Sequence, residues 1–197
     1  MLALAALGVI LIGGVLALVA FGGDDSGSAA ISSDVCTEKS FPGLQPNHLQ
    51  TPDATVKYNS FPPSSGPHYQ QYAPWGIYDE PIKQTILVHN LEHGAVVIQY
   101  GDVGEETVRK IQSFFQDDPR ALVVAPYPKL GKKIAFTAWN EPPYASGQTQ
   151  PKDADPGHGY VMTCTQWDAD AAAEFRDKRR GKAGERFPID QLVPGAQ

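Results

Sequence analysis

The sequence has little sulfur and few positive charges. It contains two cysteines and two methionines, and its 16 Lys and Arg are outnumbered by 22 Asp and Glu, for a formal net charge of −6. No Lys or Arg precedes Lys39. A protein that binds nucleic acid neutralises phosphates with clustered Lys and Arg, so this composition excludes a basic nucleic-acid-binding surface. We therefore expect no nucleic acid partner.

The first 23 residues contain no charged side chain and are rich in Leu, Ala, Val, Gly and Ile. As a helix they would extend roughly 34 Å, enough to cross a bilayer core. A secretory signal has a shorter apolar region, about 7–15 residues, and a basic leader, which is missing here. We therefore expect residues 1–23 to be a transmembrane anchor, with a cleaved signal as the alternative. Residues 24–33 read as a flexible tether, and residues 34–197 as one domain outside the cytoplasm of a single-pass membrane protein.

Cys36 and Cys164 lie near the two ends of this domain. In an oxidising compartment an even number of cysteines favours a disulfide, whereas a redox pair is usually spaced as Cys-x-x-Cys. We predict that Cys36 and Cys164 are bonded to each other.

Apolar periodicity predicts two helices. Residues 104–116 carry an apolar stripe and are followed by Asp117-Asp118-Pro119, which ends a helix. Residues 168–180 form the second helix, with Asp168 as its cap. Four apolar segments predict strands, the last two as a hairpin: 85–88, 95–100, 121–125 and 133–139. This order is typical of an α+β fold, a small mixed β-sheet with two helices packed on one side.

Two histidines and a glutamate lie within five consecutive positions, in Val88-His89-Asn90-Leu91-Glu92-His93-Gly94. A helical turn, a strand, or a tight connection at Gly94 would each let both imidazoles converge. Imidazoles between two apolar segments cost free energy unless they bond to something. Hydrogen bonds to the backbone would satisfy them, and so would a metal ion.

A third histidine, His68, ends a Pro-rich segment at residues 58–69. Prolines restrict the unfolded chain, so this loop is expected to be stiff and to present His68 at a small reorganisation cost. The alternative is a loop that packs over the core and leaves His68 exposed. We predict that His68 meets His89 and His93.

These residues define a candidate metal site. His68, His89 and His93 are the expected nitrogen ligands, and Glu92 either binds the ion or orients a histidine. Met162 is a further candidate, because a thioether would favour copper over zinc, although a methionine on a core strand is the alternative. The expected cofactor is a copper or zinc ion.

Several of these motifs resemble the bacterial family DUF3105. The resemblance rests on the segments 59–68, 76–78 and 88–94. Ala138-Trp139 is similar to the family pattern too, and the Gly184-Glu185 region is similar more loosely. It implies a membrane-anchored or exported protein with a shared site built from the two histidine motifs. It does not imply a reaction.

The function expected from the sequence is metal binding outside the cytoplasm. One alternative is a non-catalytic structural or interaction domain, because no nucleophile, phosphate-binding loop or complete triad is recognisable. Another is a metal-dependent hydrolase, because His89-x-x-Glu92-His93 matches the inverted zincin motif. That motif needs a long helix, and Gly94 would end one at once. Whether the protein is an enzyme stays open, and the sequence does not identify a protein partner.

Overall fold

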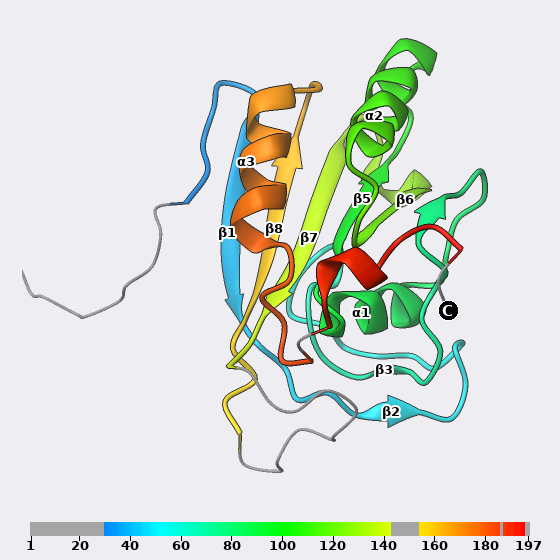
Figure 1. The fold of residues 1–197 in the computed structure, drawn as a ribbon, viewed down its shortest axis with the longest axis vertical. Helices are drawn as coiled ribbons and strands as arrows, with labels where there is room; N and C mark the ends of the chain where they lie inside the picture. Colours follow the sequence, from blue (N-terminus) through cyan, green and yellow to red (C-terminus); the bar gives the residue numbers. More distant parts are fainter. Residues whose placement is uncertain (1–29, 143–153, 186, 196–197) are drawn as a thin grey trace, which may run out of the picture.

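A computed structural model of the chain describes residues 30–142, 154–185 and 187–195. Within these ranges the protein forms an α+β fold with a six-stranded mixed sheet and three α-helices (Figure 1). The strands are β1 (Cys36–Pro42), β2 (His48–Leu49), β3 (His68–Tyr69), β4 (Gly76–Ile77), β5 (Val96–Tyr100), β6 (Leu122–Pro126), β7 (Ile134–Asn140) and β8 (His158–Cys164). The α-helices are α1 (Gln84–Glu92), α2 (Glu105–Asp117) and α3 (Ala169–Arg179), and two 3-10 helices are η1 (Pro128–Leu130) and η2 (Ile189–Gln191).

The order of the main sheet is β1-β8-β7-β5-β6-β4, and β2 and β3 form a separate parallel pair. Strand β5 is parallel to β6 and antiparallel to β7. The predicted hairpin of residues 121–125 and 133–139 is therefore wrong, since β5 lies between these two strands. Val96, Val97 and Ile98 are all fully buried, as expected for a central strand that pairs on both edges and is covered on both faces.

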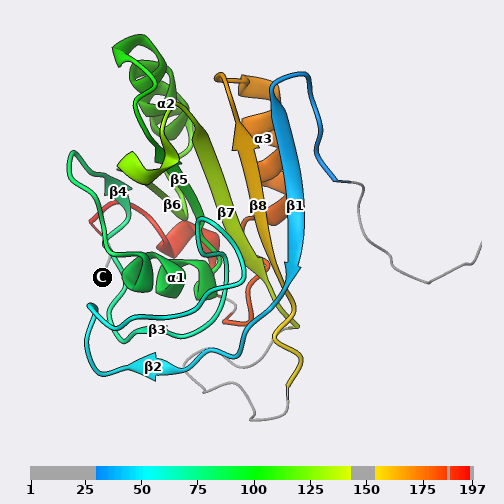
Figure 2. The same ribbon diagram turned by 180° about the vertical axis from the view of Figure 1, so that it is seen from behind.

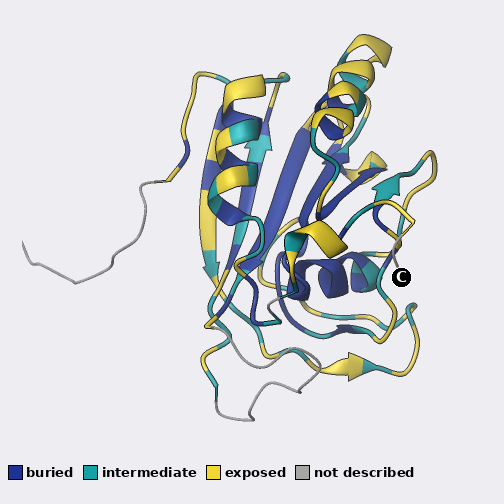
Figure 3. Ribbon diagram, viewed as in Figure 1, coloured by how far each residue is buried: buried dark blue, intermediate teal, exposed yellow. Residues whose placement is uncertain are grey.

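Helices α2 and α3 pack on one face of the sheet, as the sequence predicted. Their buried side chains, including Ile111 and Phe175, join a cluster with Ile98 and Phe136 of the strands. Each helix has exposed residues in addition to its buried ones (Figure 3). Asp168 caps α3 by accepting a hydrogen bond from the backbone N–H of Ala171 (3.0 Å). The two predicted helices are thus confirmed.

Helix α1 occupies residues 84–92, where the sequence predicted a strand over 85–88. Its residues belong to a second apolar cluster, with Leu87, Val88 and Leu91 packed against Val97 and Val123 on the other face. Thr85 and every residue from 87 to 92 are buried. The helix therefore has no solvent-exposed polar face, and the sequence lacks the alternation of apolar and polar faces that identifies a surface helix. Tertiary packing therefore overrides the β-preference of Thr85, Ile86 and Val88. In both views α1 lies with β2 and β3 at one end of the sheet (Figures 1 and 2).

Gly94 links α1 to β5 with a backbone φ of 90°, which favours glycine. A Cβ at this position would lie 2.9 Å from the Cα atom of Gly181. The Gly94 carbonyl also accepts a hydrogen bond from the Gly181 N–H (2.8 Å). This close approach joins the end of α1 to the chain that follows α3.

Within the described ranges, no helix combines the length and the apolar character needed to cross a membrane. The anchor predicted at residues 1–23 lies outside these ranges, and so do residues 24–29 of the tether.

The predicted disulfide is confirmed. Cys36 and Cys164 are bonded, with their Cα atoms 4.1 Å apart, and they face each other in the register of β1 and β8. The bridge ties the edge strand to its neighbour and closes a loop with a sequence separation of 128.

We predict that replacing both cysteines, in Cys36→Ser/Cys164→Ser, lowers the free energy of unfolding by up to about 5 kcal/mol, because the bridge restricts the unfolded chain. Urea unfolding under non-reducing conditions measures the difference. Reductant should shift the wild type in the same direction and leave the double variant unchanged. Equal unfolding midpoints for the oxidised wild type and the double variant would contradict this account.

Candidate metal centre

Strands β2 and β3 place His48 beside His68. The two residues are paired in the parallel register, and the His68 N–H donates to the carbonyl of Asn47 (3.0 Å). Their ring centroids are 5.0 Å apart. His48 is exposed, whereas His68 has no exposed surface. The Pro-rich loop therefore delivers His68 into the interior, and His48 covers it from the solvent side.

The loop that carries His68 is held by hydrogen bonds from several segments. The Tyr58 hydroxyl donates to the carbonyl of Pro67 (2.7 Å), and Ser65 Oγ accepts from the N–H of Leu44 (3.2 Å). His68 Nδ1 lies 2.8 Å from the Gly66 carbonyl oxygen. Because a carbonyl can only accept, Nδ1 carries the hydrogen, and in the neutral ring the lone pair is on Nε2.

Helix α1 supplies His89 and Glu92, and His93 is the cap residue that follows it. Asn90 anchors the helix to Ala73, since its Oδ1 accepts from the Ala73 N–H (2.9 Å) and its Nδ2 donates to the Ala73 carbonyl (2.7 Å). His89 Nδ1 donates to the Tyr69 carbonyl (2.8 Å). His89 therefore has the same tautomer as His68, with its Nε2 lone pair directed inward.

Four side chains converge in the first ligand group. His68 Nε2 is 3.0 Å from Glu92 Oε2, and His89 Nε2 is 4.0 Å from the same oxygen. The His68 and His89 ring centroids are 4.8 Å apart, and His48 and His89 are 5.5 Å apart. The potential ligand atoms of His48, His68, His89 and Glu92 all lie within 4.8 Å of one another.

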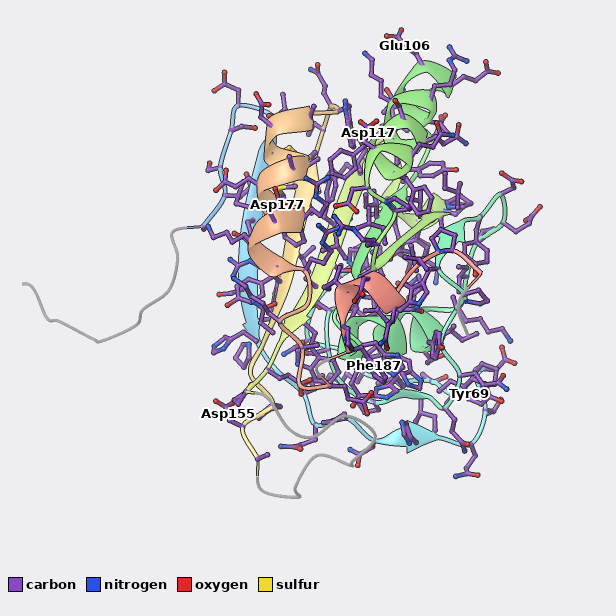
Figure 4. All side chains as sticks on the ribbon, in the orientation of Figure 1. Tyr69, Glu106, Asp117, Asp155, Asp177 and Phe187 are labelled. Carbon is purple, nitrogen blue, oxygen red and sulfur yellow. A yellow bond between two sulfur atoms is a disulfide. The ribbon has the colours of Figure 1, made fainter. Side chains whose placement is uncertain are left out.

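A second ligand group shares Glu92 and adds His93 and Glu185. His93 Nε2 lies 3.0 Å from Glu185 Oε2 and 3.0 Å from His89 Nε2. The rings of Tyr72 and Phe187 each pack with their centroids 4.7 Å from that of His93. Phe187 lies beside α1 (Figure 4). The His93 ring is therefore packed between aromatic side chains from two distant parts of the chain.

Glu141 forms hydrogen bonds with the backbone of the segment that leads to Glu185. The Gly184 N–H donates to Glu141 Oε2 (3.1 Å), and the Glu141 N–H donates to the Lys182 carbonyl (2.9 Å). Burial raises the pKa of Glu141 to about 8; the Gly184 N–H opposes this, and the charges of Glu92 and Glu185 add to it. Burial is the main cause of this shift, and the nearby carboxylates make smaller contributions.

Burial has the opposite effect on His89. It lowers the pKa of His89 from 6.5 to about 3, and the neighbouring His93 and His68 rings lower it further, against the hydrogen bond to Tyr69 and the charge of Glu92. His89 is therefore neutral near pH 7, the state in which an imidazole can bind a metal.

The structure does not bring Met162 into this cluster. Met162 is fully buried on β8, opposite Phe136 of β7, in the apolar cluster under α2 and α3. Its thioether thus packs on the sheet face opposite α1.

Sequence reasoning did not select His48 or Glu185 as ligands. His48 lies in an irregular segment, and only its pairing with His68 shows that it lies beside the predicted histidines. For Glu185 a signal existed, since the Gly184-Glu185 pair is one of the segments that resemble DUF3105. The separation of Glu185 from α1 in sequence hid its contact with His93.

An open groove of about 800 Å³ runs across the outer side of β1 and β8, lined by residues such as Lys39, Phe41 and Val161. It contains no histidine. The convergent titratable groups lie at α1 instead, so the histidine cluster is the candidate site.

A family model, "Protein of unknown function (DUF3105)", matches residues 49–188. The chain belongs to this family. The matched region includes His68, α1 and Glu185 of the site, and it begins one residue after His48. No curated protein and no solved structure matched the chain.

We predict that the metal-free protein loses stability as the pH falls from 6.5 toward 3. The unfolded chain binds a proton at His89 in this range and the folded protein does not, so the contribution of neutral His89 is complete above pH 6.5. Urea unfolding between pH 3 and 8 measures the dependence. The slope should decrease in His89→Gln, whose side chain does not titrate. An NMR titration of the His89 ring near pH 6.5 would contradict this assignment.

Proposed function

We propose that this protein binds a divalent metal ion, zinc or copper, through His48, His68, His89 and Glu92. The observation that carries the proposal is the position of His68 Nε2. This atom is buried and lies 3.0 Å from Glu92 Oε2. Among the described residues it has no hydrogen-bond partner of suitable geometry.

The tautomers of His68 and His89 support this proposal. Each ring donates its Nδ1 hydrogen to a carbonyl oxygen, so the neutral ring directs an Nε2 lone pair toward Glu92. Metal-binding histidines use the same arrangement, in which an outer hydrogen bond sets the tautomer and the orientation of the ring. A lone pair that faces a carboxylate oxygen is repelled by it, and a cation between them removes the repulsion.

The donor spacing also suits a metal ion. Zinc lies about 2.0–2.1 Å from an imidazole nitrogen, so its ligand atoms are about 3–4 Å apart. The ligand atoms of His48, His68, His89 and Glu92 lie within 4.8 Å of one another, close to this spacing. Three imidazoles and one carboxylate suit zinc or Cu(II), whereas Cu(I) prefers sulfur ligands. With Met162 in the core and both cysteines in the disulfide, the cluster itself contributes no sulfur.

A purely structural role for the histidines is the alternative, and the distinction is testable. The geometry gives the hydrolase alternative no added weight, because α1 ends at Glu92 and His93 is its cap residue. The Glu92 carboxylate also lies against His68 as a ligand would.

We also propose that the site operates outside the cytoplasm, on a protein anchored through residues 1–23. The uncharged run at residues 1–23 supports the anchor. The Cys36–Cys164 disulfide supports an oxidising compartment, because such bridges are rare in the cytosol.

We predict that His68→Ala and His48→Ala each weaken zinc binding by more than about 10–100-fold, the usual cost of losing even an outer partner of a ligand. Binding should also weaken as acid protonates the imidazoles. Competition with a chromophoric chelator measures the affinity. His158→Ala is the matched control, because His158 is exposed on β8 and belongs to neither ligand group. Equal affinities in all four proteins would leave the structural role standing.

A further inference from the structure

The ligand atoms around α1 exceed what one ion needs. His48, His68, His89 and Glu92 already complete a four-coordinate site. His93 and Glu185 remain, and with Glu92 they form a second group whose ligand atoms also lie within 4.8 Å of one another. Glu92 is the residue that the two groups share.

The contacts of His93 also indicate a second cation. His93 Nε2 lies 3.0 Å from two atoms that can accept a hydrogen, His89 Nε2 and Glu185 Oε2. His89 Nε2 is an acceptor because the ring hydrogen of His89 is on Nδ1, which donates a hydrogen bond to the Tyr69 carbonyl. One hydrogen on His93 Nε2 cannot point at both acceptors. If each imidazole instead binds its own ion, both lone pairs face a cation and the close approach of the two nitrogens is explained.

We propose that the site is dinuclear, with a second divalent ion held by His93 and Glu185 and with the Glu92 carboxylate bridging the two ions. This inference rests on the proposed function, because Glu92 serves both ions. The carboxylates of Glu92 and Glu185 supply the negative charge that a second dication requires. Ions in known dinuclear sites lie about 3.5–4 Å apart, a separation that a single carboxylate can bridge.

A second ion would explain the positions of His93 and Glu185, which are not ligands of the first ion. Glu185 is held at the site by the backbone of Gly184, which bonds to Glu141 (3.1 Å). His93 follows directly on α1, so this end of the helix brings one histidine to each ion, His89 to the first and His93 to the second. The tight turn at Gly94 then lets the chain enter β5 without displacing His93.

The test is the metal content of the full chain, purified in detergent and loaded with zinc, measured by elemental analysis and native mass spectrometry. The wild type should hold two ions per chain. Glu185→Gln and His93→Gln should each retain one ion, with affinity for the other reduced at least about tenfold. His158→Ala should retain both. Circular dichroism checks that each variant is folded.

One ion in the wild type, unaffected by Glu185→Gln, would overturn the second site and leave the proposed function intact. No ion in the wild type would overturn the proposed function, and the dinuclear site with it. Two ions that persist in both variants would overturn the assignment to His93 and Glu185. Loading with Cu(II) tests the bridge, because two coupled ions give a half-field signal in electron paramagnetic resonance, and two isolated signals would overturn it.

Discussion

Two hydrogen bonds from imidazoles to the backbone organise the centre of this protein. His68 Nδ1 donates to Gly66 and His89 Nδ1 donates to Tyr69, so both rings are tied to the same short stretch of chain around β3. Each bond settles which nitrogen carries the lone pair, and it directs both Nε2 atoms toward Glu92. The positions of α1 and of the Pro-rich loop thus depend on each other, because a shift of either would break these bonds.

The fold around this junction provides rigidity on three sides. Asn90 binds both backbone groups of Ala73, Gly94 packs against Gly181, and Glu141 binds the backbone at Gly184. Each contact joins α1 or its surroundings to a segment far away in the sequence. The ligand groups come from four separate parts of the chain, and these contacts hold the parts together. Because the side chains are already held in place, ordering them when a ligand binds costs less free energy.

Burial has opposite effects on the two kinds of titratable group at this site. It favours the neutral imidazole of His89 and the protonated carboxyl of Glu141, because a charge is poorly solvated in the interior. The neutral ring of His89 can bind a metal, whereas a protonated carboxyl is not a ligand. A cation bound nearby would favour the ionised form of the Glu141 carboxyl.

Local features of the sequence determined several elements of this protein. The apolar stripe of residues 104–116, the cap at Asp168 and the cysteine pair predicted α2, α3 and the disulfide, because each signal lies in neighbouring residues or in a scarce residue type. The family could be recognised from its two histidine motifs. The tertiary structure alone decided that residues 84–92 form a helix, because burial on all sides removes the polar stripe that marks one. It also decided that β5 separates β6 from β7, and that His48 and Glu185 meet the predicted histidines, since such contacts join distant segments and leave no periodic signal in the chain.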